Sequence, residues 1–200
     1  LLLLIMKLVF ATNNKNKLTE VKNLVTSIDI VSLTDINCLE NIPETSKTIE
    51  GNASQKAFYI YNKYKLNCFA DDTGLEIEAL GGMPGVRSAR YAGSDAVAEN
   101  NIRKVLEELN GITTRKAKFK TVISLVIDGK EKQFFGIING TILTEKHGTQ
   151  GFGYDPIFVP DGSERTFAQM NLEEKNKISH RAIAVKKLAE WLITNYQRGN

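Results

Sequence analysis

Cysteine and histidine are scarce in this sequence. Its 200 residues include two cysteines, Cys38 and Cys68, which form no CxxC pair, and two histidines, His147 and His180. Isolated cysteines form neither a zinc site nor a disulfide framework, and two histidines are too few for a histidine-rich zinc site. We therefore expect both cysteines to be buried thiols in a reducing cytoplasm.

The signatures of several enzyme classes are missing as well. No GxSxG segment occurs, and neither cysteine has a convincing partner for nucleophilic catalysis. The polar loop TNNKNK, at residues 12–17, matches neither GxGxxG nor the P-loop patterns GxxxxGKS and GxxxxGKT. This loop therefore predicts neither a dinucleotide-binding fold nor a P-loop.

The hydrophobic N-terminal stretch is short. LLLLIMKLVFAT cannot span a bilayer, and it lacks the basic region and small-residue cleavage site of a signal peptide. We expect Met6 to be the natural start and residues 1–5 to be an upstream extension. Residues 6–200 are then expected to form a single domain with no membrane partner.

The composition indicates one globular core and a small anionic substrate. Hydrophobic residues make up 42% of the chain, the net charge is +3, and the pI is about 8.8. The basic residues are scattered rather than gathered in one stripe, which argues against a nucleic-acid partner. A mildly basic protein suits an anionic small molecule.

Hydrophobic periodicity predicts a mixed sheet with helices. Apolar runs and alternation indicate strands at residues 7–12, 28–33 and 67–72, and two long strands joined by the turn Asp128-Gly129. Helix-linked strands together with a long hairpin are typical of an α/β domain.

Helical spacing of apolar residues predicts four helices. The first follows residue 17, the second runs from about Glu50, the third lies between a cap at Ser94 or Asp95 and Gly111, and the last begins near Ser179. The inward-facing residues of the last helix are expected to be Ala184, Leu188, Trp191 and Leu192.

Four polar segments are candidates for chemistry, and each has a purely structural alternative. The loop at residues 12–17 joins a strand to a helix, where free N–H groups, asparagines and the charges of Lys15 and Lys17 suit a phosphate. The alternative is a solvated helix start.

Asp71 and Asp72 follow an apolar run, and we expect the strand to end there. Adjacent carboxylates repel one another, so a cation is expected to compensate their charge. Mg²⁺ favours one or two carboxylates together with waters and phosphates, and Glu44 is a candidate third acid. One aspartate then binds metal while the other orients or deprotonates a water. The alternative is a strand end with a helix cap.

The last two segments are GTQGFGYDP, at residues 148–156, and EEKNKISHR, at residues 173–181. In the first, aromatic rings between glycines suit a stacked nucleobase, and Asp155 can bond to a base or sugar edge. The alternative is a loop in which glycines meet positive φ angles. In the second, Lys175, His180 and Arg181 can bind a purine edge or a phosphate, and the alternative is a charged surface loop capped by Ser179.

Taken in order, these segments closely resemble the inosine triphosphatase family of purine nucleoside triphosphate pyrophosphatases. The resemblance covers nearly the whole chain from Met6. It is carried by FATNNKNKLTEV, ETSKTIEGNASQKA, FADDTGLEIEALGGMPGVRSARYAG, TQGFGYDPIF and EEKNKISHRAIA. Small departures are the asparagine-rich first loop, where many members carry glycine, and the LLLLI leader.

The resemblance implies a role for each matching residue. Asp72, supported by Asp71, matches the residue that ligates metal and accepts the proton of the water, and Glu44 matches a second metal-site acid. The residues expected to bind substrate are Thr12, Asn13, Asn14, Lys15, Asn16, Lys17, Lys56, Thr73, Phe152, Gly153, Tyr154, Asp155, Lys175, His180 and Arg181. Within this set, residues 12–17 match the triphosphate loop, residues 152–155 the base-binding segment, and the last three residues the purine readers.

The resemblance further implies an elongated mixed α/β fold, with two lobes and a substrate cleft between them, in a cytoplasmic homodimer. The implied activity is Mg²⁺-dependent hydrolysis of ITP, dITP and XTP to the nucleoside monophosphate and pyrophosphate. Three alternatives stay open: a nucleotide sensor without catalysis, a nucleic-acid-binding module, and a pyrophosphatase for other modified nucleotides.

Overall fold

The computed structural model describes residues 7–25 and 28–196. The expected start at Met6 and the extension at residues 1–5 lie outside the described residues. The helices are α1 (Lys15–Leu24), α2 (Ile49–Tyr64), α3 (Ala98–Glu108), α4 (Leu172–Ile178) and α5 (His180–Tyr196). The strands are β1 (Lys7–Phe10), β2 (Asp29–Val31), β3 (Cys68–Ile77), β4 (Pro84–Gly85), β5 (Lys116–Ile127), β6 (Lys130–Ile142) and β7 (Phe158–Pro160).

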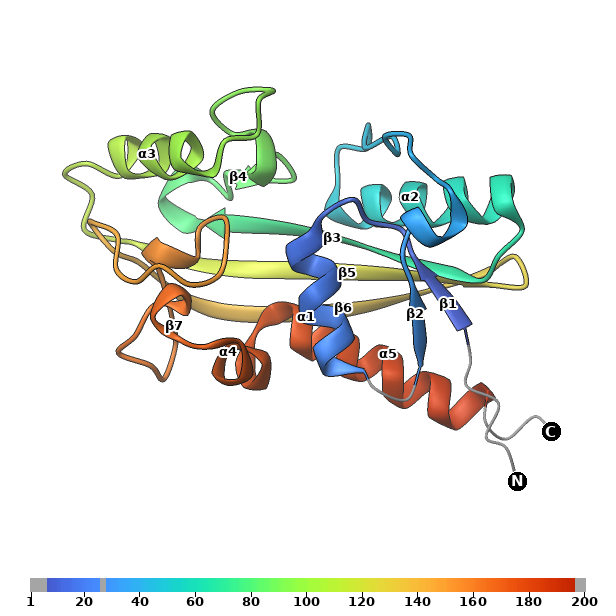
Figure 1. The fold of residues 1–200 in the computed structure, drawn as a ribbon. Helices are drawn as coiled ribbons and strands as arrows, with labels where there is room; N and C mark the ends of the chain where they lie inside the picture. The colour runs from blue at the N-terminus through green and yellow to red at the C-terminus, as the bar shows by residue number, and fades with distance from the viewer. Residues whose placement is uncertain (1–6, 26–27, 197–200) are drawn as a thin grey trace. The chain divides into compact units, whose positions relative to one another are not determined.

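The strands form a mixed sheet, which confirms the predicted α/β class. Their order is β2-β1-β3-β5-β6-β7, and β4 pairs with β3 outside this path. Strand β1 runs parallel to β2 and β3, whereas β4 and β7 are antiparallel to β3 and β6 (Figure 1). The predicted hairpin turn joins β5 to β6, with φ angles of 50° at Asp128 and 78° at Gly129. Positive φ at both turn residues matches the twist of a two-residue hairpin.

The chain divides into two compact units. Unit 1 contains Leu1–Asp72, Thr121–Gly136 and Arg181–Asn200, and unit 2 contains Thr73–Lys120 and Ile137–His180. The predicted two lobes and cleft, and the extent of a single domain over residues 6–200, stay predictions.

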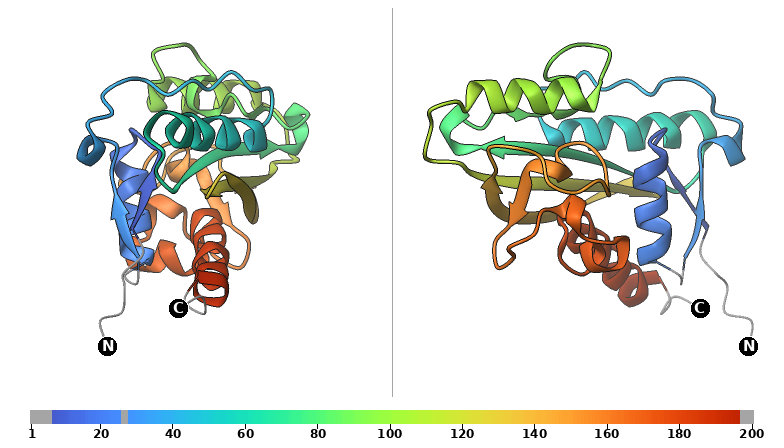
Figure 2. Two further views of the ribbon diagram at one scale, coloured as in Figure 1. Left: turned by 90° about the vertical axis from the view of Figure 1, so that its right-hand side faces the viewer. Right: turned by 60° about the vertical axis from the view of Figure 1, so that its left-hand side comes forward.

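In unit 1, strand residues alternate between two hydrophobic clusters. Leu8, Phe10 and Phe69 pack with residues of α1 and α5, whereas Val9, Cys68 and Ala70 pack with residues of α2. Figures 1 and 2 accordingly show α2 and α5 on opposite sides of these strands. The alternation follows from the two-residue period of a strand, which sends successive side chains to opposite faces.

Unit 2 has its own aromatic core. Helix α3 contributes Ile102 and Val105, which cluster with Leu75 and Ile77 of β3. The rings of Phe119 and Phe158 meet edge to face at 4.7 Å between centroids. Burial of such large side chains is the main source of stability for this unit.

The cysteines and the last helix agree with their predictions. Cys38 and Cys68 are buried free thiols, and burial raises the pKa of Cys68 to about 12. Ala184, Leu188 and Leu192 are buried, and Trp191 is partly buried against the same cluster. None of the helices in the described ranges combines the length and apolarity needed to span a bilayer.

Three local expectations are wrong. The strand predicted to end at Asp72 continues to Ile77, because Leu75 and Ile77 extend its buried face. Helix α3 is not capped by Ser94 or Asp95, since it begins after Val97 and Asp95 accepts a bond from Asn100 instead. The segment before His180 is the short helix α4, for which Asn171 and Glu174 form a capping box.

Candidate active site

The loop between β1 and α1 is open to a ligand. Asn13 to Asn16 are exposed, and Asn14 caps α1 by accepting a bond from the N–H of Lys17 at 3.1 Å. The Thr12 hydroxyl accepts from the N–H of Asn14 at 3.2 Å, which tightens the turn. The predicted triphosphate residues 12–17 therefore surround the positive end of a helix.

Asp71 and Asp72 point to opposite faces of the sheet. They lie within β3 rather than at its end. Because successive residues of a strand direct their side chains to opposite faces of the sheet, the two carboxylates point away from each other. Asp71 shares its face with α1 and α5, and Asp72 shares its face with α2. The expected repulsion between neighbouring carboxylates is thus reduced by geometry, and each has basic partners of its own.

Asp71 is buried in an ion network. Its Oδ1 accepts from Lys17 Nζ at 3.0 Å, and its Oδ2 accepts from Arg181 Nε at 3.1 Å. A second guanidinium nitrogen of Arg181 bonds to Glu20. Burial alone would raise the pKa of Asp71, but the charges of Lys17 and Arg181 outweigh it and hold that pKa well below its usual range. Asp71 is therefore ionised at neutral pH.

Asp72 is held by α2. Lys56 Nζ lies 3.4 Å from Asp72 Oδ1 and 2.5 Å from Glu44 Oε1, while Asn52 Nδ2 donates to Asp72 Oδ2 at 3.3 Å. Burial raises the pKa of Asp72, and the charges of Glu44 and Asp71 raise it further against the opposing effect of Lys56 and Lys17. The structure therefore brings together Glu44, Lys56 and Asp72, and the roles predicted for them stay predictions.

The residues present fit a divalent cation. Two carboxylates, Glu44 and Asp72, face the same ammonium group, and this donor set suits Mg²⁺ when phosphates and waters complete the shell. The two ion networks carry a net charge of −1, from Glu20, Glu44, Asp71, Asp72, Lys17, Lys56 and Arg181. A net negative charge at this place would favour a bound cation. No group of three or more potential protein ligands gathers around one point in residues 7–25 and 28–196.

In unit 2, Asp155 and Lys175 form a buried ion pair. Lys175 Nζ lies 2.6 Å from Asp155 Oδ2 and stands 4.9 Å from the ring centre of Phe152. The same carboxylate accepts from the N–H of Phe152 at 2.8 Å. A Cβ on Gly151 would lie 2.1 Å from Asp155 Oδ2, and Gly151 has a φ angle of +73°. This glycine is therefore required both by backbone conformation and by space, as the structural alternative predicted.

The remaining predicted residues of unit 2 lie in or beside the core. The Tyr154 ring is buried, and its hydroxyl donates to the Ser88 carbonyl at 2.8 Å. The His180 ring is buried and stacks on Phe119 at 4.5 Å between centroids. Thr73 is half-buried on β3. Their roles toward a substrate stay predictions.

Comparison with known proteins decides the family. The model of the Ham1 family matches residues 8–191. This chain belongs to the Ham1 family. The resemblance found in the sequence motifs is thereby confirmed.

Relatives of this Ham1 chain are similar over almost their whole length. A dITP/XTP pyrophosphatase of Christiangramia forsetii is 57% identical over 94% of this chain and 99% of its own. A dITP/XTP pyrophosphatase of Porphyromonas gingivalis is 51% identical over 94% and 97%. The solved structure of the Staphylococcus aureus Ham1 protein has a TM-score of 0.86 and 38% identity, with coverage of 94% and 98%.

Two contact residues of this Ham1 chain were missed by sequence reasoning. Glu20 bonds to Arg181, and Asn52 bonds to Asp72. Both lie on helices next to a predicted basic residue, Glu20 three positions after Lys17 and Asn52 four positions before Lys56. A polar residue three or four positions from a predicted site residue lies on the same face of the helix. This spacing is the sequence signal that could have identified both residues.

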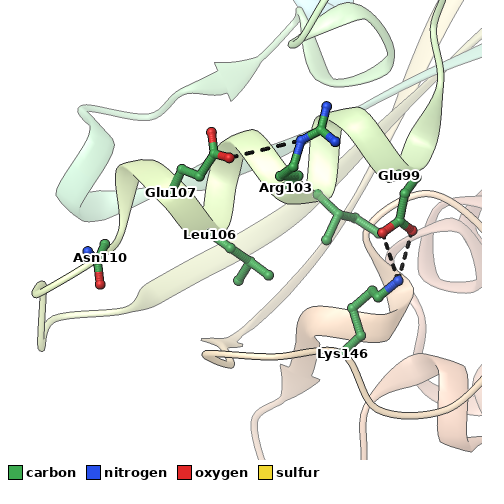
Figure 3. A pocket seen from close by; sticks show the side chains of 7 residues that line it. Glu99, Arg103, Leu106, Glu107, Asn110 and Lys146 are labelled. Carbon is green, nitrogen blue, oxygen red and sulfur yellow. Dashed lines mark hydrogen bonds and ion pairs between the residues drawn. The ribbon is translucent and has the colours of Figure 1, made fainter.

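A surface hollow of the Ham1 chain lies in unit 2. It has a volume of about 500 Å³ and runs along α3, where Ile102 and Leu106 line it, and Asn110 lines it beyond the end of the helix (Figure 3). Figure 3 shows Lys146 directed at Glu99. Lys146 Nζ lies 2.8 Å from Glu99 Oε1. None of the predicted site residues lines this hollow.

Proposed function

We propose that this chain is a pyrophosphatase for non-standard purine nucleoside triphosphates, namely ITP, dITP and XTP. The observation that carries the proposal is the meeting of three side chains: Lys56 of α2 lies against both Asp72 of β3 and Glu44 of the segment before α2. It is supported by family membership and by relatives named dITP/XTP pyrophosphatase. The reaction would break the bond between the α and β phosphates and release the nucleoside monophosphate and pyrophosphate.

We assign the phosphate chemistry to unit 1. Asp72 orients a water and accepts its proton as the water oxygen attacks phosphorus. Lys56, Lys17 and Lys15 offset phosphate charge, and the loop at residues 12–17 supplies N–H groups. Asp71 keeps Lys17 in place through their ion pair. Positioning and charge stabilisation supply most of the rate in phosphoryl transfer, and these groups would contribute to both.

Glu44 and Asp72 are the residues that would hold Mg²⁺. When bound, the ion would act as a Lewis acid and neutralise phosphate charge. The need for a cation follows from the net negative charge of the surrounding side chains. We further propose a homodimer that works in the cytoplasm, where the nucleotide pool is cleansed.

We assign purine recognition to residues 152–155, Lys175, His180 and Arg181. A donor placed at the 6-oxo group of hypoxanthine or xanthine bonds to it, whereas the 6-amino group of adenine leaves that donor unpaired. An unpaired buried donor costs about 1–3 kcal/mol. The candidates for this donor are His180, Arg181 and backbone N–H groups.

Product analysis tests the proposed function. The protein with Mg²⁺ is given ITP, dITP, XTP, GTP and ATP separately, and we expect pyrophosphate and monophosphate from the first three and little from ATP. Orthophosphate with IDP would place the cleavage at another bond. Binding of ITP without turnover would favour a sensor, and turnover of other modified nucleotides alone would favour the related pyrophosphatase. Salt-sensitive binding to oligonucleotides without turnover would favour a nucleic-acid-binding module.

The His180→Ala variant tests purine recognition. We expect the ratio of kcat/KM for ITP to that for ATP to fall by roughly 5- to 150-fold, the equivalent of about 1–3 kcal/mol. The ratio is the right measurement because a partly unfolded sample lowers both values equally. His147→Ala is the control, since His147 is half exposed beside Glu145. An unchanged ratio in His180→Ala would remove His180 from purine recognition.

A further inference from the structure

Asn52 is a buried polar residue on the face of α2 that meets Asp72. Its side chain is 5% exposed, and the buried residues of the same helix are otherwise Ile49, Ala53, Lys56, Ala57 and Ile60. Asn52 and Lys56 are four positions apart, so they lie one above the other on the helix. Lys56 faces Asp72 Oδ1 and Asn52 faces Asp72 Oδ2. One helix face thus contacts both carboxylate oxygens.

The orientation of the Asn52 amide follows from its second bond. The backbone N–H of Ser46 donates to Asn52 Oδ1 at 2.9 Å, and a backbone N–H can only donate. The amide oxygen must therefore face Ser46, which directs Nδ2 toward Asp72. Ser46 follows Glu44 by two positions. Asn52 thus links the strand that carries Asp72 to the segment that carries Glu44.

We propose that Asn52 is a positioning residue, which holds the Asp72 carboxylate and the Glu44 segment in fixed relation to each other. The expected effect of Asn52 on catalysis rests on the proposed function. The link that Asn52 makes between Asp72 and Ser46, called the bridge below, rests only on the two hydrogen bonds and on the burial of Asn52. An amide suits this place because it donates to one group and accepts from the other, whereas a carboxylate or an ammonium does only one.

Replacement of Asn52 should lower kcat more than it changes KM. Asn52 contacts the aspartate rather than the proposed substrate residues of the first loop, so ITP binding should change little. Groups that orient a catalytic or metal-binding side chain typically contribute 10- to 100-fold to activity, and we expect a loss of about this size. A residue important only for folding would lower the melting temperature and leave kcat per folded molecule unchanged.

Three variants separate these roles. Asn52→Ala removes both bonds, and Asn52→Asp keeps an acceptor for Ser46 but removes the donor to Asp72. Asn101→Ala is the matched control, because Asn101 is equally buried and its amide bridges Ala92 and Ala89 in unit 2. Steady-state kinetics with ITP and Mg²⁺, thermal unfolding, and NMR hydrogen exchange of the Ser46 amide are measured on the full chain.

We expect kcat to fall about 10- to 100-fold in both Asn52 variants, with KM within about threefold of the wild type. The Ser46 amide should exchange faster in Asn52→Ala but stay protected in Asn52→Asp. Asn101→Ala should lose stability and keep its kcat. Wild-type kcat in both Asn52 variants, with a loss of stability like that of Asn101→Ala, overturns the inference.

The NMR data decide the bridge independently of turnover. If the wild-type protein hydrolyses none of the nucleotides, the proposed function fails. The bridge still stands if Ser46 exchange responds as expected and if the Asn52 side-chain NH₂ signals move in an Asp72→Ala variant. Unchanged Ser46 exchange in Asn52→Ala and unmoved NH₂ signals reject the bridge.

Discussion

The Asp72→Asn variant is expected to lose at least about 100-fold in kcat toward ITP, because the amide cannot accept the proton of the attacking water. A positioned general base contributes typically about 10²–10⁴-fold. The same change also removes one of the two carboxylates proposed to hold the metal ion. Steady-state release of pyrophosphate from ITP measures the effect.

The stability of Asp72→Asn should stay the same or rise. The pKa of Asp72 is raised in the folded protein, so the fold favours the protonated carboxyl group. Ionisation of such a group costs stability at every pH above its unfolded pKa, and this cost is largest above the folded pKa. At pH 7 the neutral asparagine removes that cost. A loss of activity together with a lower melting temperature would point to misfolding rather than to a missing base.

Asp35→Asn is a control for which we expect the change in folding stability to have the opposite sign. Asp35 is exposed, and bonds from the side chain and the backbone of Ser32 lower its pKa. Its charge therefore favours the folded state above its unfolded pKa, and this contribution fades as the pH falls through the lowered value. Asp35→Asn should keep full activity and lose a little stability at pH 7.

The second large effect is expected in the Arg181→Met variant, which should lose about 3–5 kcal/mol of folding stability. Methionine fills much of the same space, but it removes the cation that contacts Asp71 and Glu20. Removal of one member of a buried ion network typically costs this amount, because the opposite charges stay buried. For a chain of this size the melting temperature should fall by roughly 6–20 °C. Urea unfolding and calorimetry measure it.

A second substitution should restore part of this loss. Glu20→Leu in the Arg181→Met background removes one buried carboxylate, while Asp71 keeps its ion pair with Lys17. We therefore expect the double variant to be more stable than Arg181→Met alone, with a coupling energy of about 0.5–3 kcal/mol. Arg103→Met is the exposed control, because its ion pair with Glu107 lies in solvent and contributes less than about 1 kcal/mol. Equal losses in Arg103→Met and Arg181→Met would contradict the buried network.

Local patterns in the sequence were sufficient for much of the fold. The alternation in Phe119, Thr121 and Ile123 and the turn at Asp128-Gly129 predicted β5, β6 and their hairpin. These features depend on the two-residue period of a strand and on the φ angles that a two-residue turn requires. The strand period and the turn angles depend only on residues that are neighbours in the sequence. They can therefore be predicted without knowing which distant segments the strands contact.

The motifs also selected candidate site residues in advance. Glu44, Lys56 and Asp72 were selected from three separate segments, and the structure brings these three together. Their selection rests on the resemblance to a family, because no local pattern tells which acidic residues meet. Element ends were harder to predict: β3 passes through Asp72, since the apolar face of Leu75 and Ile77 continues the strand beyond the charged pair.

Only the tertiary structure shows which side chains the adjacent aspartates contact. The sequence predicts that two neighbouring carboxylates repel each other, but it does not say that a strand runs through both. Once β3 is continuous, Asp71 faces Lys17 and Arg181, while Asp72 faces Asn52 and Lys56. Arg181 lies 110 positions from Asp71 along the chain. A buried charged side chain is stabilised by the oppositely charged side chains that the fold brings next to it. Helical or strand periodicity predicts the face of the element on which a side chain lies, but it does not predict which residue that side chain contacts.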